Sequence, residues 1–150
     1  MLKLIYSMAE LDIEQLLGIY IEHGWDEADF LFYLREDFFR QPNAVYAVWV
    51  EDSEYKSAVR LEPYRGGGML LHSLETAPNA RRKGYASNLL VHFLDYLRTT
   101  DCKAVYSHIE KRNRASLELH KICGFEIVAD TATYLDGTVT QYSYTMCCHI

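Results

Sequence analysis

The chain has 150 residues, of which 49% are hydrophobic and 24% charged, and its formal net charge is −6 at pH 7. This length suits one domain that can bury a core, so we expect a single domain over residues 1–150. An acidic chain is a poor general binder of nucleic acids or anionic membranes, and no apolar run is long enough to span a bilayer. Neither partner is therefore expected.

The start of the chain turns acidic too early for a signal peptide, so a cytoplasmic location is the default expectation. The four cysteines lack a Cys-x-x-Cys spacing and are expected to be free thiols. Cys147, Cys148 and His149 are adjacent, but neighbouring strand residues point to opposite faces. We therefore expect no metal site.

In the first half, hydrophobic periodicity and turn signals predict strands around two helices. Ser7 and Glu10 match a capping box at the start of the first helix, and His23-Gly24 ends it. The run "RGGG" lies between two strands with no helix after it, which favours a hairpin turn over a phosphate loop. The predicted elements are a strand at 2–6, helices within 8–23 and 26–42, and strands at 44–50, 55–64 and 68–77.

In the second half, apolar spacing predicts a helix from Tyr85 to Leu97 and a strand at 102–109. Asn113 can cap a further helix that ends at Gly124. Asp136-Gly137 is a tight-hairpin signal between strands at 125–135 and 138–148. The order is βααβββαβαββ, and because a helix separates the strands that follow residue 102, the sheet is expected to be mixed.

The stretch "ETAPNARRKGYASNLL" (75–90) places Arg81, Arg82 and Lys83 before Gly84 and a helix start. A helix N-terminus has free amides and a partial positive charge, and Gly84 lets a ligand approach the backbone. These features predict a phosphate site. A solvated basic patch is the alternative, but cations there oppose the helix dipole. The Walker and dinucleotide glycine motifs are absent.

Two motifs resemble those of the GNAT superfamily of N-acetyltransferases. The first is the acyl-CoA motif, represented here by Leu74, Thr76, Pro78, Arg81, Gly84 and Ala86. The second is represented by Asn113, Ser116, Leu119, His120, Gly124 and Phe125. The resemblance covers essentially the whole chain. It implies an α/β (α+β) fold with a mixed central sheet and helices on both faces.

The resemblance also implies acetyl-CoA as a cosubstrate, bound where the strands at 68–77 and 102–109 separate, and no metal. The backbone of Leu74 and Thr76 would bind the pantetheine arm, and Arg81 would add positive charge. Asn113 and Ser116 would meet the pantetheine or the phosphates. The pyrophosphate would lie on backbone amides of Arg82, Lys83, Gly84, Tyr85, Ala86 and Ser87.

The implied reaction is direct transfer of an acetyl group to a primary amine of a small molecule or peptide. A backbone amide near Thr76 would hold the thioester oxygen. His120 stands where the family usually has the tyrosine acid, so it is either that acid or a residue that only packs there. His72 is the base candidate, the alternative being an ordinary half-buried histidine. Glu75 is a further base candidate, although strand alternation is expected to turn it away from His72.

In this family, the segments matching residues 8–42 and 134–140 largely set acceptor specificity. The first segment is rich in acids and aromatics, which favours a cationic amine, although core aromatics and solvated acids explain the same pattern. These residues are Glu22, Asp26, Glu27, Asp29, Glu36 and Asp37, with Trp25, Phe30, Phe32, Tyr33, Phe38 and Phe39. A noncatalytic acyl-CoA-binding sensor or interaction module is the alternative function, and a homodimer stays open.

Overall fold

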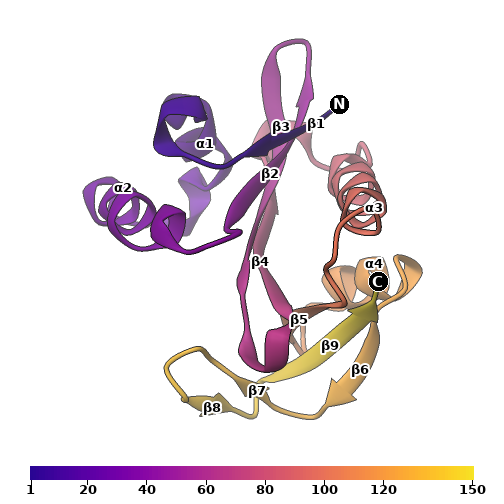
Figure 1. Ribbon diagram of the computed structural model, residues 1–150. Helices are drawn as coiled ribbons and strands as arrows, with labels where there is room; N and C mark the ends of the chain where they lie inside the picture. The colour runs from indigo at the N-terminus through magenta and orange to yellow at the C-terminus, as the bar shows by residue number, and fades with distance from the viewer.

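The computed structural model describes residues 1–150 and is built on a seven-stranded sheet (Figure 1). Neighbouring strands are antiparallel except β4 and β5, which are parallel because a helix connects them. The sheet is therefore mixed, as predicted. Its strands in spatial order are β1 (Leu2–Ile5), β2 (Val45–Glu51), β3 (Glu54–Pro63), β4 (Met69–Thr76), β5 (Ala104–Glu110), β9 (Ser143–His149) and β6 (Glu126–Ala129).

Helices cover both faces of the sheet, as the resemblance implied (Figure 1). The helices α1 (Ile13–Ile19) and α2 (Glu27–Glu36) pack on one face, and α3 (Tyr85–Leu97) and α4 (Arg114–Ile122) pack on the other. Alternate residues of β2 enter the two cores, with Ala47 on the α3 side and Tyr46 on the α1 side. A strand buried on both faces reads as a continuous apolar run, as β2 does.

The N-terminal helical segment differs in detail from the prediction. The capping box is wrong, because Ser7 makes no capping hydrogen bond and Glu10 accepts from the amide of Tyr6 instead. A single 3-10 turn ends there, and α1 begins after Asp12, whose carboxylate accepts from the amide of Gln15. The helix predicted at 26–42 is α2 followed by a separate turn. The 3-10 turns are Met8–Glu10, Ile21–His23, Phe38–Arg40, Arg65–Gly67 and Pro78–Ala80.

The C-terminal strands are shorter than predicted. The segment expected as one strand at 125–135 forms β6 and then β7 (Ala132–Thr133), and the segment at 138–148 forms β8 (Val139–Thr140) and then β9. β7 and β8 make a separate two-stranded sheet, so only β6 and β9 join the central one. The hairpin at Asp136-Gly137 is confirmed, since the Gly137 amide donates to Tyr134 O at 2.9 Å. The turn at 65–68 is also confirmed as a β3–β4 hairpin.

The centre of the sheet opens where β4 and β5 separate. Their pairing ends at Leu71 and Ser107, although both strands continue beyond these residues. On its other side β4 has a β-bulge, since Arg60 pairs with His72 whereas Ala58 pairs with Glu75. The edge of β4 that faces β5 is therefore unpaired from residue 72 onward.

Ser73 adopts a left-handed conformation inside this bulge, with φ 57°. Tyr20 donates to its carbonyl oxygen at 2.7 Å, and Arg60 donates to its hydroxyl at 2.6 Å. Tyr46 in turn donates to the Tyr20 hydroxyl at 2.7 Å. The bulge is thus held by side chains from β2, β3 and the residue that follows α1.

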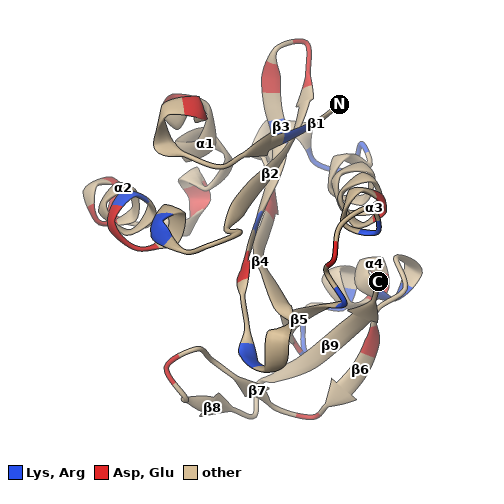
Figure 2. Ribbon diagram, viewed as in Figure 1, with Lys and Arg blue, Asp and Glu red and all other residues tan.

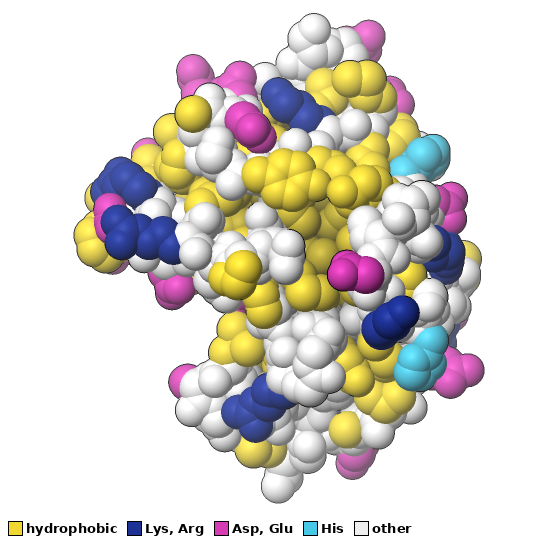
Figure 3. All heavy atoms as spheres, in the orientation of Figure 1, with side chains coloured by type: hydrophobic (Ala, Val, Ile, Leu, Met, Phe, Trp, Pro, Cys, Tyr) yellow, Lys and Arg dark blue, Asp and Glu magenta, His cyan; other side chains and the backbone are white.

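The surface is hollowed between the part that carries α2 and the part that carries β7 and β8 (Figure 3). These parts contain the two segments that the resemblance associated with acceptor specificity. Acidic residues mark α1, α2 and the β2–β3 hairpin (Figure 2). The aromatics of the first segment are divided, since Phe38 is buried whereas Phe32 and Trp25 are exposed.

Candidate active site

A cavity of about 200 Å³ lies where β4 and β5 separate. β4, β5 and α4 all contribute to its walls. It brings together five of the predicted site residues, His72, Leu74, Asn113, Ser116 and His120. The other lining residues are Leu71, Ser73, Ser107, His108, Ile109 and Glu110.

His72 lies beside a buried carboxylate that the sequence analysis did not identify. Its Nε2 atom is buried and lies 3.1 Å from Glu62 Oε1 without making a hydrogen bond. Glu62 is only 2% exposed, and Gln41 donates to its other oxygen at 2.8 Å. This places a carboxylate directly behind the candidate base.

The protonation states of the pair follow from their surroundings. Burial lowers the pKa of His72, and this effect exceeds the raising effect of Glu62. For Glu62, burial acts to raise the pKa, but His72, Gln41 and Arg60 together outweigh it and lower the pKa. At neutral pH a neutral imidazole therefore faces an ionised carboxylate, which is the state that a general base requires.

His120 is fully buried, and both of its ring nitrogens have protein partners. Nδ1 lies 2.7 Å from the carbonyl oxygen of Ser116, so Nδ1 carries the proton. In the neutral ring Nε2 then accepts, and the Ser107 hydroxyl lies 3.2 Å from it. Burial also lowers the pKa of His120. A neutral His120 thus has no proton at Nε2 to give to a leaving group.

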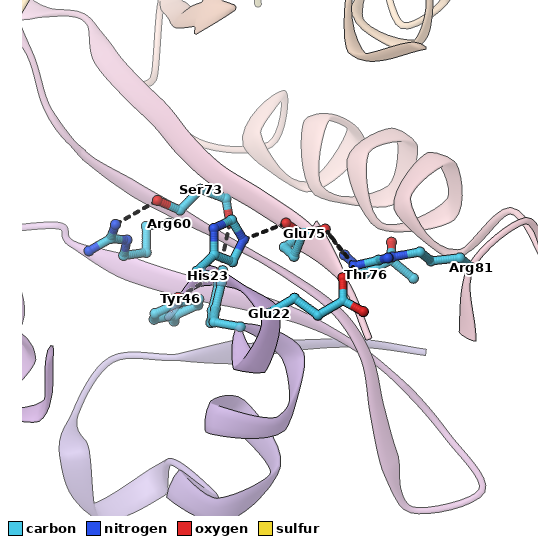
Figure 4. A network of polar contacts seen from close by, with 9 residues as sticks. Glu22, His23, Tyr46, Arg60, Ser73, Glu75, Thr76 and Arg81 are labelled. Atoms are coloured by element: carbon cyan, nitrogen blue, oxygen red, sulfur yellow. Dashed lines mark hydrogen bonds and ion pairs between the residues drawn. The ribbon is translucent and has the colours of Figure 1, made fainter. Parts of the chain in front are cut away.

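Glu75 is part of a polar network on the α1 side of the sheet (Figure 4). Its Oε2 lies 2.6 Å from His23 Nε2, and its Oε1 accepts from the amide of Thr76 at 3.3 Å. Arg81 Nη2 lies 3.9 Å from Glu75 and 2.9 Å from Glu22. The bulge shifts the alternation by one residue, so Glu75 and His72 share a face, and the expectation that they point apart is wrong.

The N-terminus of α3 has the features that the sequence predicted. Gly84 precedes the helix at φ 81° with no side-chain cap. Asn88 makes the first intrahelical bond, to Gly84 O, so the amides of Tyr85, Ala86 and Ser87 lack partners in the helix. An added Cβ at Gly84 would meet no atom within 4 Å, so the space in front of these amides is open.

The basic residues before Gly84 differ in their contacts. Arg81 is paired with Glu22, whereas Arg82 and Lys83 are exposed and make no ion pair. Arg82 also has a positive φ of 63°, so the backbone turns sharply just before the helix. Free cations and free amides therefore occur together here, which suits a phosphate group.

The open edge of β4 ends close to this helix, because Ser57, which pairs with Thr76, donates to Tyr85 O. Ala77 N donates to Lys56 O in β3, so the backbone of the preceding residue, Thr76, points away from β3. Leu74 follows the bulge directly and packs half-buried against the α3-side core. An open strand edge beside a helix N-terminus fits an extended ligand that ends in phosphates, as the pantetheine and pyrophosphate of CoA do.

Asn113 caps α4 as predicted, because its side-chain oxygen accepts from the amide of Ser116 at 3.1 Å. That oxygen is therefore already used. Ser116 has its hydroxyl 3.4 Å from His120 Nδ1. Both residues reach the cavity from the first turn of the helix.

Sequence reasoning missed Arg60, Glu62, Ser73 and Ser107. Arg60 and Glu62 could have been found from the sequence, because they are two positions apart in an otherwise apolar stretch of a strand and therefore share one face. Ser73 and Ser107 could not, since only the tertiary structure creates the bulge and the strand separation.

No group of three or more His, Cys, Asp or Glu side chains is arranged to hold a metal ion. The four cysteines are all unpaired thiols. None of the helices is both long and apolar enough to cross a membrane.

The separation of β4 from β5 and the uncapped N-terminus of α3 are features that the two GNAT-like motifs implied. The profile of the Acetyltransferase (GNAT) family matches residues 6–125, and the chain therefore belongs to this family. No protein of curated function matches the chain significantly in sequence.

Solved structures share the fold at low sequence identity. The ribosomal-protein-S18-alanine N-acetyltransferase from Escherichia coli has a TM-score of 0.73 and 17% identity, over 100% of this chain and 94% of that one. The PaiA N-acetyltransferase from Thermoplasma acidophilum, in complex with coenzyme A, has a TM-score of 0.67 and 12% identity, over 100% of this chain and 99% of that one. A spermidine N-acetyltransferase chimera from Vibrio cholerae and hSSAT has a TM-score of 0.73 and 19% identity, over 99% of this chain and 95% of that one. These likenesses show the fold.

Proposed function

We propose that this protein is an N-acetyltransferase that moves an acetyl group from acetyl-CoA directly to a primary amine of a small molecule or peptide. Family membership supports the reaction class. The observation that carries the proposal is the separation of β4 from β5 next to the uncapped N-terminus of α3. The similar structures are named for amine acceptors of different kinds, which supports an amine and leaves its identity open.

When bound, acetyl-CoA supplies an acetyl group whose C–S bond breaks as an amide C–N bond forms, leaving CoA as a thiol. The amides of Gly84, Tyr85, Ala86 and Ser87 would bind its phosphates, with charge from Arg81, Arg82 and Lys83. Leu74, Thr76, Asn113 and Ser116 would hold the pantetheine arm. The carboxylate of Glu75 must then leave the amide of Thr76, with which it is bonded now.

His72 is the proposed base. It is half-buried and lines the cavity, and its pKa is lowered so that it is neutral at pH 7. Glu62 would stabilise the imidazolium once the proton is taken. Glu62 is thus a positioning residue. Glu75 is the second candidate, since it shares the face of His72, but His23 and Arg81 already engage its carboxylate.

We propose that His120 is a positioning residue and does not itself protonate the departing thiolate. The ring holds the Ser107 hydroxyl against the cavity, and the departing thiolate takes its proton from solvent. The alternative, in which a protonated His120 is the acid, predicts that His120→Tyr keeps its rate to higher pH than wild type, because a phenol stays protonated to about pH 10.

Two measurements on the full chain test the function. Acetyl-CoA and CoA should raise the melting temperature, and an amine panel should yield acetylated products by mass spectrometry together with CoA thiol. Mass spectrometry is needed because the chain itself has four thiols. A thermal shift without any product would support the noncatalytic acyl-CoA-binding module, and no shift at all would overturn both functions.

A further inference from the structure

A second pocket, of about 430 Å³, lies on the α2 side of the sheet. Aromatic side chains form much of its wall, and the guanidinium of one arginine reaches it from β3. Its lining residues are Trp25, Asp26, Asp29, Phe30, Tyr33 and Arg60. The pocket therefore combines an apolar wall with charges of both signs.

Arg60 is a buried cation without an anionic partner. It is 7% exposed and forms no ion pair with any carboxylate. Its Nη2 donates to Ser73 Oγ at 2.6 Å, but Nε is buried with no hydrogen-bond partner, and Nη1 makes no hydrogen bond. A guanidinium has five N–H donors, and leaving them unpaired away from water is costly. Arg60 is thus incompletely satisfied within the chain.

The nearest acid on its strand is already engaged. Glu62 lies two residues along β3, on the same face, but its oxygens are used by His72 and Gln41. Around Arg60 the neighbours are rings instead, with Tyr33 at 5.1 Å and Phe30 at 5.9 Å from the guanidinium carbon. These rings do not take up the N–H donors of the guanidinium, so Nη1 and the second N–H of Nη2 remain for a carboxylate.

Arg60 is also next to the proposed base. It pairs with His72 across the two strands, so the side chains are neighbours on one face. Its hydrogen-bond partner Ser73 lines the cavity between β4 and β5 (Figure 4). A carboxylate bound by Arg60 would therefore lie near the proposed base, and an amine close to that carboxylate could meet His72.

We propose that Arg60 binds a carboxylate of the acceptor, so that the substrate is a small amino acid-like molecule that carries an amine and a carboxylate close together. This inference rests on the proposed function, because it describes the acceptor of that reaction. The walls formed by Trp25, Phe30 and Tyr33 favour an apolar or aromatic side chain. This acceptor differs from the purely cationic amine that the acidic N-terminal segment suggested.

The two aspartates of the pocket provide a control. The Asp26 carboxylate accepts from the amide of Asp29 as the cap of α2 and is committed to the helix. The Asp29 carboxylate makes no hydrogen bond or ion pair of its own, and it would repel a bound carboxylate. Removing its charge should therefore strengthen the acceptor complex, which is the opposite of the effect expected at Arg60.

The experiment compares phenylalanine and leucine with their carboxamides, which lack the negative charge. It is run at a pH high enough to deprotonate both amines, because the carboxylate also raises the pKa of the amine beside it. In wild type the acids should have the higher kcat/KM. Arg60→Met should lower kcat/KM for the acids roughly 10- to 100-fold more than for the amides, mainly through KM, since both reactions also lose the Arg60–Ser73 hydrogen bond. Arg60→Lys should retain part of the preference, and Asp29→Asn should increase it.

The outcomes separate the inference from the function. If Arg60→Met lowers acids and amides equally, or wild type prefers the amides, Arg60 is structural and the inference is wrong while the acetyltransferase stands. If no amine is acetylated, the melting temperature with CoA present is measured instead. A rise with the acids but not with the amides, which is lost in Arg60→Met, supports the carboxylate site. If Arg60→Met does not fold, two other variants test the site. Arg60→Lys should reduce the preference for acids over amides and Asp29→Asn should increase it, and absence of these opposite changes would contradict the inference.

Discussion

Glu62 lies 3.1 Å from His72 Nε2, with its own charge almost completely removed from solvent. A buried carboxylate in this position favours the protonated imidazole, whereas burial of the histidine opposes it. The balance lowers the pKa of His72, so the ring is neutral at pH 7 and becomes charged only in acid. The pair thus joins the proposed base, in its neutral form, to a carboxylate that would stabilise the imidazolium after proton transfer.

The first prediction concerns the pH dependence of catalysis. kcat/KM should fall in acid with a midpoint below 6.5, because the lowered pKa keeps His72 neutral down to that pH. Glu62→Gln should move the midpoint still lower and reduce the rate, since the charge that raises the pKa is gone. His72→Ala should cost about 10²- to 10⁴-fold. Profiles of kcat/KM from pH 5 to 9 measure this, with His149→Gln as the control. If Glu62→Gln does not change the midpoint of the acidic limb of the kcat/KM profile, Glu62 does not influence the pKa of His72 and the prediction is wrong.

The second prediction concerns the stability of the fold in acid. His120 is fully buried and burial lowers its pKa, so below pH 6.5 the unfolded chain binds a proton that the folded chain does not. The unfolding free energy should then decrease as pH falls below 6.5, by up to about 1.4 kcal/mol per pH unit for this one group.

Urea denaturation at pH 7.5 and 5.5 checks this prediction. His120→Gln should be less stable than wild type at pH 7.5, because it disturbs the contacts with Ser107 and Ser116. It should nevertheless lose less stability on acidification. An unchanged pH dependence in the variant would show that His120 is protonated in the folded state.

The third prediction concerns Gly84 and the cofactor. Gly84→Val should lower stability, because a β-branched residue is strained at φ 81°, and should remove most of the thermal shift given by acetyl-CoA. Gly84→Asn tolerates that φ better, so it should keep more of the stability while still losing the shift. Gly18→Ala is the control. If Gly84→Asn keeps the full shift, the glycine serves the turn alone and not the approach of phosphates.

The fourth prediction concerns Glu22, whose carboxylate lies 2.9 Å from Arg81 Nη2. Glu22→Gln should tighten acetyl-CoA binding by a few-fold at low salt, because it releases Arg81 from an exposed ion pair, and such pairs are weak. The gain should shrink as salt rises. Calorimetric titrations at two salt concentrations measure this, with Glu14→Gln as the control. Weaker binding in Glu22→Gln would mean that Glu22 orients Arg81 for the cofactor.

Local signals in the sequence predicted much of the fold and five of the residues that line the cavity between β4 and β5. The glycine before α3 and the cap of α4 by Asn113 both depend on hydrogen bonds within one turn, which short motifs encode. Ser7 and Glu10 show the limit of such motifs, because the matching residues occur in a 3-10 turn that ends before the helix begins.

Long-range contacts decided the rest. Glu75 was expected to point away from His72 because strands alternate, and one bulge residue, Ser73, reversed this. The positive φ of Ser73 is held by Tyr20 and Arg60, which are distant in sequence, so no local pattern could reveal it. The same holds for the meeting of Glu62 with His72.

The sequence by itself determined which segments form strands and helices up to α4, the glycine and cations that precede α3, and membership of an acetyltransferase family. Periodicity, turn residues and motif spacing depend on residues that are close together in the sequence, so they can be recognised in a single sequence. Only the tertiary structure decided where β4 parts from β5, which faces His72 and Glu75 occupy, and that Arg60 is buried without a carboxylate. These depend on register and burial, which arise when segments far apart in the chain pack together.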